Sequence, residues 1–140
     1  MHAPSRIAAL AMAPCLLSAA ARAELPLPEM EPFAEAVEAC APMEGVVMPP
    51  ILPEQPVTLI IAGEVDGACR HTQLHVDDIA VECALSAEGR STLAAHLRRL
   101  GHDREAWVWP EQNQAWHAEC AILIGDVLVP SPGWATTRPD

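Results

Sequence analysis

Cysteines are the residues of this chain whose types and number point most clearly to chemistry. The sequence contains five of them, and Cys15 lies in an apolar N-terminal stretch that we expect to be removed. An even set in a small exported domain predicts two disulfides. Clustered thiols could instead hold zinc, but no C-x-x-C pair occurs, so we expect no metal site. The cysteines assigned to disulfides are Cys40, Cys69, Cys83 and Cys120.

Histidines and carboxylates form a second group of candidate ligands. His71 and His75 precede Asp77 and Asp78, and histidines four residues apart on a helix would converge on a metal ion. This segment has the pattern of a strand, where the two imidazoles are roughly 13 Å apart at about 3.3 Å per residue. We therefore interpret these side chains as surface residues on the outer face of a sheet.

The four tryptophans gather in the last third of the chain. Tryptophan is strongly enriched at binding hot spots, so these residues are candidate binding residues. The alternative is that they fill a core that has few other aromatic side chains. The set is Trp107, Trp109, Trp116 and Trp134.

Nothing in the sequence predicts a nucleophile or a cofactor. Ser86 and Ser91 precede a helical pattern and are explained as helix caps. The chain has no G-x-S-x-G, no Walker loop and no C-x-x-C-H motif, and we expect no cofactor.

The N-terminal half of the mature chain predicts one helix and one linker. Apolar residues from Met30 to Ala41 fall at helical spacing, and Pro42 ends the helix. Residues 42–56 contain five prolines, which exclude a helix interior or a central strand. We interpret 42–56 as a surface linker.

Residues 57–85 predict a three-stranded meander. Asp66-Gly67 is a strong hairpin turn, and Asp77-Asp78 is a second candidate turn. Closing both as two-residue turns places Ile61 opposite Thr72. The apolar face of this register then holds Val57, Leu59, Ile61, Leu74, Val76, Ile79, Val81, Cys83 and Leu85.

A helix and a hairpin follow the meander. Leu93, Leu97 and Leu100 form a helical stripe that ends at Gly101. Short strands are expected at 107–109, 115–124 and 127–129. The predicted fold class is α+β, mainly β: a small OB-like barrel over 57–135, preceded by the helix and linker of 24–56 and followed by a tail, 136–140.

The same register favours one disulfide pairing among the three that four cysteines allow. It places Cys83 on the apolar face, together with Cys40 on the apolar stripe of the first helix. Cys69 then points to the opposite face. We therefore expect Cys40–Cys83 and Cys69–Cys120.

Residues 1–23 have the form of a secretory signal peptide, with an A-x-A cleavage site at 21–23. Cleavage removes Arg6 and Arg22 and moves the net charge from −11 to −13. Such an acidic chain is a poor partner for nucleic acid or an anionic membrane surface. We expect a periplasmic or secreted protein, with no membrane insertion after signal cleavage.

The strand and helix order, with four short stretches, resembles the thermonuclease, or staphylococcal-nuclease-like, family. The stretches are TLIIAGEVDGAC, LHVDDIAVECALSAEG, GRSTLAAHLRRLG and the segment from Val127 to Ala135. The resemblance covers most of 57–135 and implies the OB-like barrel.

The chain differs from that family at the positions that carry out the family's chemistry. The resemblance implies a calcium carboxylate after Asp66-Gly67, where Ala68 stands, and two phosphate-binding arginines that are missing between His71 and Gly89 and between Glu105 and Thr137. Only Glu88 occupies a place suited to the general base. A calcium-assisted phosphodiesterase needs these cations to neutralise developing charge.

These observations predict an exported, disulfide-stabilised, non-catalytic protein that binds a protein or a small ligand. One alternative is a divergent metal-dependent nuclease, in which Glu88 would be catalytic. The other is a structural accessory subunit of an envelope complex, docked through the Pro-rich segment and the tryptophans.

Overall fold

The computed structural model describes residues 25–140. The expected signal peptide, 1–23, lies outside the described residues. The elements follow one another as α1 (Glu31–Ala39), β1 (Met43–Val47), β2 (Val57–Val65), β3 (Ala68–Leu74), β4 (Ile79–Leu85), α2 (Ala87–His102), α3 (Glu105–Val108), the 3-10 helix η1 (Ala115–Glu119), β5 (Cys120–Ile124) and β6 (Val127–Leu128).

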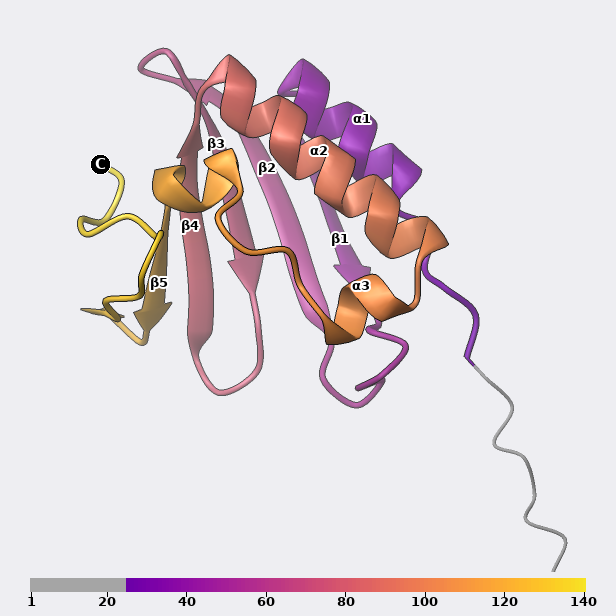
Figure 1. Ribbon diagram of the computed structural model, residues 1–140. Helices are drawn as coiled ribbons and strands as arrows, with labels where there is room; N and C mark the ends of the chain where they lie inside the picture. Colours follow the sequence, from indigo (N-terminus) through magenta and orange to yellow (C-terminus); the bar gives the residue numbers. More distant parts are fainter. Residues whose placement is uncertain (1–24) are drawn as a thin grey trace, which may run out of the picture.

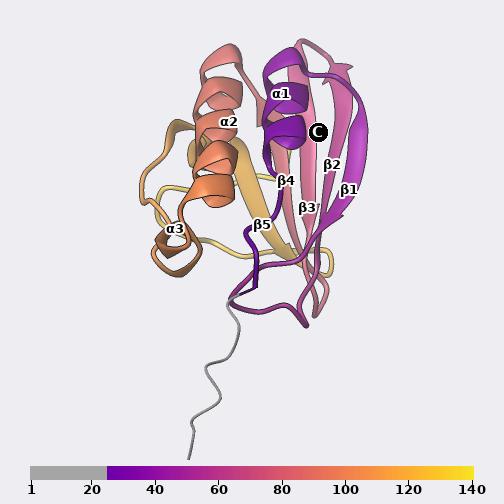
Figure 2. The same cartoon turned by 90° about the vertical axis from the view of Figure 1, so that its right-hand side faces the viewer.

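The strands form one six-stranded antiparallel sheet in the order β1-β2-β3-β4-β5-β6. Helices α1 and α2 lie side by side over one face of this sheet, and α3 lies near its lower end (Figures 1 and 2). The α+β class, the first helix, the meander β2-β3-β4 and the succession of helix and hairpin are confirmed. Within residues 25–140 no helix is long and apolar enough to cross a membrane.

Strand β1 corrects the interpretation of 42–56 as a linker. Residues 43–47 pair with β2 and form the first strand of the sheet. The prolines excluded a central strand, but Pro42 and Pro49 flank this segment without interrupting it. An edge strand accepts prolines at its ends because it needs ladder bonds on one side only.

The register of β2 against β3 is correct near the turn and wrong beyond it. Val65 faces Ala68, as predicted. The pairing then shifts by one residue at Ala62, so that Ile61 faces His71. A bulge of this kind places one extra residue in one strand and reverses the faces beyond it.

A second extra residue lies at the next turn. The backbone N–H of His75, and not that of Val76, donates to the carbonyl of Ile79 at 2.8 Å. Asp77 and Asp78 both have positive φ, at 62° and 57°, as the predicted tight turn requires. The ladder that follows is therefore one residue out of the expected register.

Because of the two shifts, the side chains of β3 lie on the sheet faces opposite to those predicted. The side chains of β2 and β4 lie on their predicted faces. Leu59 and Ile61 of β2 are buried, as are Val81, Cys83 and Leu85 of β4. Strand β3 presents Cys69, His71 and Gln73 to the helices instead of Leu74, which is exposed. The predicted placement of His71 on the outer face is wrong.

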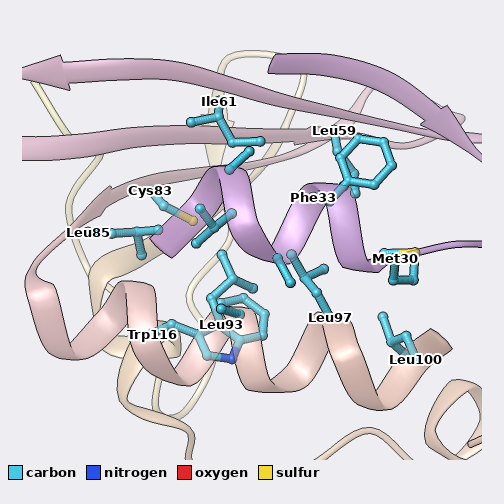
Figure 3. Close-up of a cluster of buried hydrophobic side chains, with 14 of the residues drawn as sticks. Met30, Phe33, Leu59, Ile61, Cys83, Leu85, Leu93, Leu97, Leu100 and Trp116 are labelled. Atoms are coloured by element: carbon cyan, nitrogen blue, oxygen red, sulfur yellow. The ribbon is translucent and has the colours of Figure 1, made fainter. Parts of the chain in front are cut away.

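The core lies between this sheet face and the two helices. The predicted stripe of Leu93, Leu97 and Leu100 on α2 is buried, and Phe33 and Val37 of α1 pack into the same cluster (Figure 3). Ser86 is the N-cap of α2, since its hydroxyl accepts from the N–H of Gly89 at 3.2 Å.

Both disulfides are present, but the predicted pairing is wrong. Cys40 bonds Cys69, and Cys83 bonds Cys120. The prediction placed Cys69 on the outer face, and the reversal of β3 brings it to the inner face, within reach of Cys40, the residue that caps the C-terminal end of α1. Cys83 and Cys120 are then register partners on β4 and β5.

Two expected strand segments are helical. Residues 107–109 were predicted as a strand, but 105–108 form α3, which begins where Asp103 Oδ1 accepts from the N–H of Glu105 at 2.9 Å. Residues 115–119 form η1, and only 120–124 form β5. A short apolar run cannot distinguish a strand from one helical turn by periodicity alone.

Candidate functional site

A pocket of about 190 Å³ lies between the inner face of the sheet and the helices α2 and α3. Both layers contribute to its walls, which are mostly apolar. Among the residues that the structure describes, no Asp, Glu, Arg or Lys lines it. The lining residues are Met30, Val47, Val57, Leu59, Gln73, His75, His96, Leu97, Leu100, Ala106, Trp107, Pro110 and Trp116.

The side chain of Trp107 is held between this pocket and a neighbouring one. Its indole N–H donates to the carbonyl of Leu100 at 2.8 Å, which anchors α3 to the C-terminal turns of α2. The second pocket, of about 210 Å³, shares Val57, His75 and Trp107 with the first. Its other lining residues are Pro49, Ile51, Leu52, Gln55 and Val76. The two pockets therefore adjoin at the lower end of the sheet.

The inner face of the sheet contains a buried, hydrogen-bonded histidine. His71 is 1% exposed and lies between its register partners Ile61 and Cys83. Its Nδ1 lies 3.1 Å from the carbonyl of Ile60, and its Nε2 lies 3.2 Å from the side-chain nitrogen of Gln73. A carbonyl can only accept, so Nδ1 carries the proton and Nε2 accepts from Gln73.

Burial lowers the pKa of His71 to about 4, although the hydrogen bond to Ile60 opposes this effect. The imidazole is therefore neutral at pH 7. Burial also lowers the pKa of His75, which lines both pockets. The sheet wall of the pocket thus carries hydrogen-bonding groups without net charge.

Four aromatic rings cluster on the side of the pocket opposite the sheet. His96 and Trp116 line the pocket, and His117 and Trp134 pack against Trp116. Trp116 packs against His96 at 5.5 Å, against His117 at 4.2 Å and against Trp134 at 5.5 Å between ring centroids. Trp134 stacks on His117 at 4.6 Å. Burial, helped by the nearby His117 and Arg99, lowers the pKa of His96 to about 4.

One polar atom of a residue in this wall has no hydrogen-bond partner within residues 25–140. Trp116 is 4% exposed, and its indole Nε1 is buried without a hydrogen bond. An unpaired buried N–H costs about 1–3 kcal/mol, so such groups are rare in folded proteins. Trp116 also lines the pocket, and it belongs to the same buried cluster as Leu93 of α2 (Figure 3).

The structure divides the four candidate tryptophans. Trp107 and Trp116 line the pocket, and Trp134 supports Trp116 from its edge. Trp109 is 76% exposed and lines neither of the two pockets. Two segments, 48–52 and 108–109, carry several exposed large apolar side chains, which we together call the end patch: Met48, Ile51, Leu52, Val108 and Trp109.

Glu88 lies away from the pocket, exposed in the first turn of α2. The carboxylate nearest this helix start is that of Glu119, which accepts from the backbone N–H of Ser86 at 2.8 Å and from its hydroxyl. In the described part of the chain no three His, Cys, Asp or Glu side chains come together as a metal-binding group.

The arrangement can hold a small uncharged molecule, because an apolar pocket with a few hydrogen-bonding groups is the usual form of such a site. Sequence reasoning found two of its tryptophans and missed Gln73, His75 and His96. The i, i+2 spacing of His71, Gln73 and His75 was visible, but their polarity indicated the outer face.

Comparisons of the chain with protein-family models, with curated proteins and with solved structures found no significant match.

Proposed function

We propose that this is an exported, disulfide-stabilised, non-catalytic binding protein that holds a small apolar molecule in the pocket between the sheet and α2. The observation that carries the proposal is the pocket itself. Its walls come from both layers of the fold and carry no charged residue. A buried cavity of about 150 Å³ is large enough for benzene, so a pocket of about 190 Å³ admits a substituted ring or a short chain.

Two features support the position of the pocket as a stable site. The disulfide Cys83–Cys120 joins the strands β4 and β5, and the disulfide Cys40–Cys69 joins α1 to β3. The sheet that forms one wall of the pocket is therefore cross-linked between two of its strands, and the first helix is cross-linked to the sheet. A preformed site loses little conformational freedom when it binds its ligand.

The two disulfides fit an oxidising compartment, which supports the proposed periplasmic or secreted location. We propose export with cleavage after Ala23. Intact-mass analysis of the envelope fraction should then find a chain that begins at Glu24, and a full-length cytosolic species would contradict export.

The binding function is tested by filling the pocket. Ala106 is a buried lining residue, so Ala106→Leu should abolish binding of isopropylbenzene, measured by saturation-transfer NMR. The matched control is Ala95→Leu, the same change at an exposed position of α2, which should bind as the wild type does. Absence of binding by the wild type would contradict the proposal.

A second candidate function is that of an accessory subunit of an envelope complex. The observation that favours it is the end patch, where five large apolar side chains are exposed. The test is a pull-down from envelope extract with the wild type and with Trp109→Ser. A defined partner lost with Trp109→Ser and kept with Ala106→Leu would favour this function over the pocket.

The resemblance to the thermonuclease-like family and its OB-like barrel stays a prediction. The described pairing runs from β1 to β6, and within residues 25–140 no β1–β6 pair closes it. The proposed binding function does not depend on this closure, since the pocket lies between the sheet and the helices.

A further inference from the structure

We infer that the ligand of this pocket is an uncharged alcohol or phenol whose hydroxyl donates a hydrogen bond to the side-chain oxygen of Gln73. The inference deepens the proposed function and rests on it. It adds to that proposal the chemical class of the ligand and the atom that selects it.

The first argument is the fixed orientation of the Gln73 amide. Nδ1 of His71 donates to the carbonyl of Ile60 at 3.1 Å, so Nε2 of this neutral ring can only accept. The side-chain nitrogen of Gln73 lies 3.2 Å from that Nε2, where an amide oxygen would meet a second acceptor. The amide nitrogen of Gln73 is therefore paired with His71, and its oxygen Oε1 is left for another partner.

The second argument is that this oxygen is open to the pocket. Gln73 is half-buried on the inner face of the sheet, which the helices cover, and its side chain lines the pocket (Figure 2). Within residues 25–140 its Oε1 has no hydrogen-bond partner, and the only side-chain polar atom enclosed there without a partner is Nε1 of Trp116. Oε1 of Gln73 therefore keeps accessible surface, so a hydroxyl in the pocket can approach it.

The third argument is charge. The lining residues that the structure describes include no acid and no arginine, so an ammonium group would lie here without a counter-ion. Burial lowers the pKa values of the two histidines that line the pocket, His75 and His96, so both rings are neutral at pH 7. Burying an unpaired charge is far more costly than burying a hydrogen-bonded hydroxyl.

The fourth argument is that a hydroxyl group both donates and accepts. Its hydrogen pairs with Gln73, while its oxygen can accept from a ring N–H of His75 or His96, which line the same pocket. A ketone or an ether only accepts and cannot pair with Oε1 of Gln73. The pocket therefore favours alcohols and phenols over ketones and ethers of the same size.

Four probes of equal heavy-atom count separate these terms. 1-Phenylethanol carries the hydroxyl, acetophenone carries only an acceptor, isopropylbenzene has a methyl group in place of the oxygen, and 1-phenylethylammonium carries a charge. Affinities for the full mature protein are measured by NMR titration at pH 7 and about 0.15 M salt, which screens its acidic surface. The quantity of interest is the affinity of each polar probe divided by that of isopropylbenzene, because this ratio cancels the effect of the apolar walls.

Gln73→Met keeps the length of the side chain and removes the acceptor. We expect this change to lower the ratio for 1-phenylethanol about threefold to tenfold, the value of one net hydrogen bond, and to leave the ratio for acetophenone unchanged. The matched control is Gln112→Met, at an exposed glutamine that lines neither pocket, which should leave both ratios unchanged. An equal fall in the ratio for acetophenone would contradict the assignment to the amide oxygen.

A direct readout needs no variant. In the wild type, the side-chain carbonyl carbon resonance of Gln73 should move downfield with 1-phenylethanol and not with isopropylbenzene, which brings the same ring. This resonance decides alone if Gln73→Met fails to bind isopropylbenzene, since that failure would mean a damaged pocket.

The failure of the inference and that of the proposed function are distinguishable. If isopropylbenzene binds but the Gln73 resonance does not move with 1-phenylethanol and the ratio is the same in Gln73→Met, the inference is wrong and the proposed function stands. If none of the neutral probes binds, the proposed function is wrong, and the inference with it. Binding of 1-phenylethylammonium as tight as that of 1-phenylethanol would contradict the uncharged class.

Discussion

Cys83 and Cys120 stand directly opposite each other on β4 and β5 and are joined by a disulfide, with 4.1 Å between their Cα atoms. This disulfide therefore joins two neighbouring strands of the sheet and does not connect the sheet to a helix. The other bridge, Cys40–Cys69, connects the C-terminal end of α1 to β3. The Cys83–Cys120 disulfide stabilises the pairing of two strands, and the Cys40–Cys69 disulfide holds the first helix against the sheet.

The first prediction concerns these two bridges. Peptide mapping without reduction should recover Cys40–Cys69 and Cys83–Cys120. Replacing both Cys40 and Cys69 by Ala should lower the free energy of unfolding by about 3–4 kcal/mol, because the bridge closes a loop between residues 29 apart in sequence. Urea unfolding at pH 7 measures the change. A Cys69–Cys120 peptide would mean that β3 presents its other face.

The second prediction concerns acid stability. The folded pKa of His71 is about 4, below its ordinary value of 6.5, so the unfolded chain binds the extra proton between these values. Stability should therefore be full above about pH 6.5 and fall as the pH falls toward 4, by up to about 3 kcal/mol from this residue.

The measurement is urea unfolding at several pH values between 4 and 7. His71→Gln should make the pH dependence less steep, because Gln does not titrate and keeps a donor and an acceptor. The remaining dependence includes His96, whose pKa burial also lowers to about 4. The control is His102→Gln, at an exposed position. An equally steep dependence in His71→Gln would show that His71 is not responsible.

The third prediction concerns the start of α2. A Cβ on Gly89 would collide with a carboxylate oxygen of Glu119. Gly89→Ala should therefore displace Glu119 from Ser86 and cost about 1–2 kcal/mol, the usual value of a lost cap.

The background Glu119→Ala decides whether that contact is the cause. In this background Gly89→Ala should be neutral or stabilise by up to about 1 kcal/mol, because alanine is the better helix former. Thermal unfolding of the four variants of this cycle gives the coupling. An equal loss of stability in both backgrounds would show that the cost comes from replacing Gly89 and not from its contact with Glu119.

The fourth prediction is that the protein does not cleave single-stranded DNA in the presence of calcium. Ala68 stands where the resemblance to thermonucleases implies a calcium carboxylate, and Glu88 is exposed at the start of α2. The assay follows release of acid-soluble nucleotides. Turnover that disappears in Glu88→Gln would favour the divergent nuclease instead.

The helices α1 and α2 and two of the central strands were predictable because their patterns are simple. Leu93, Leu97 and Leu100 follow the helical period, and β4 alternates cleanly through Val81, Cys83 and Leu85. Each such segment shows its buried face without reference to its neighbours. Ser86 was one of two candidate caps, and the carboxylate of Glu119 that supports it comes from a segment 33 residues away.

Strand β3 could not be assigned from its pattern. Its buried face carries Cys69, His71 and Gln73, which is less apolar than the face carrying Leu74. The choice of face depends on the two extra residues, at Ala62 and at the turn after Leu74. Gly63, which follows Ala62 and has a φ of 103°, is the type of residue that marks a bulge, but the alternation of β3 itself does not indicate which face is buried. The disulfide pairing and the polar wall of the pocket were missed for the same reason.

The extra residue at Ala62 also bears on how this fold can change over generations. Ala62 has no register partner, whereas Ile61 pairs with His71 and Gly63 pairs with Arg70. Deleting Ala62 would make Ile61 and Gly63 neighbours in the sequence and would keep both pairs, so Cys69 and His71 would still face the helices. Homologous chains can therefore lose this one residue without losing the Cys40–Cys69 disulfide, and we expect chain length to vary at this point of β2.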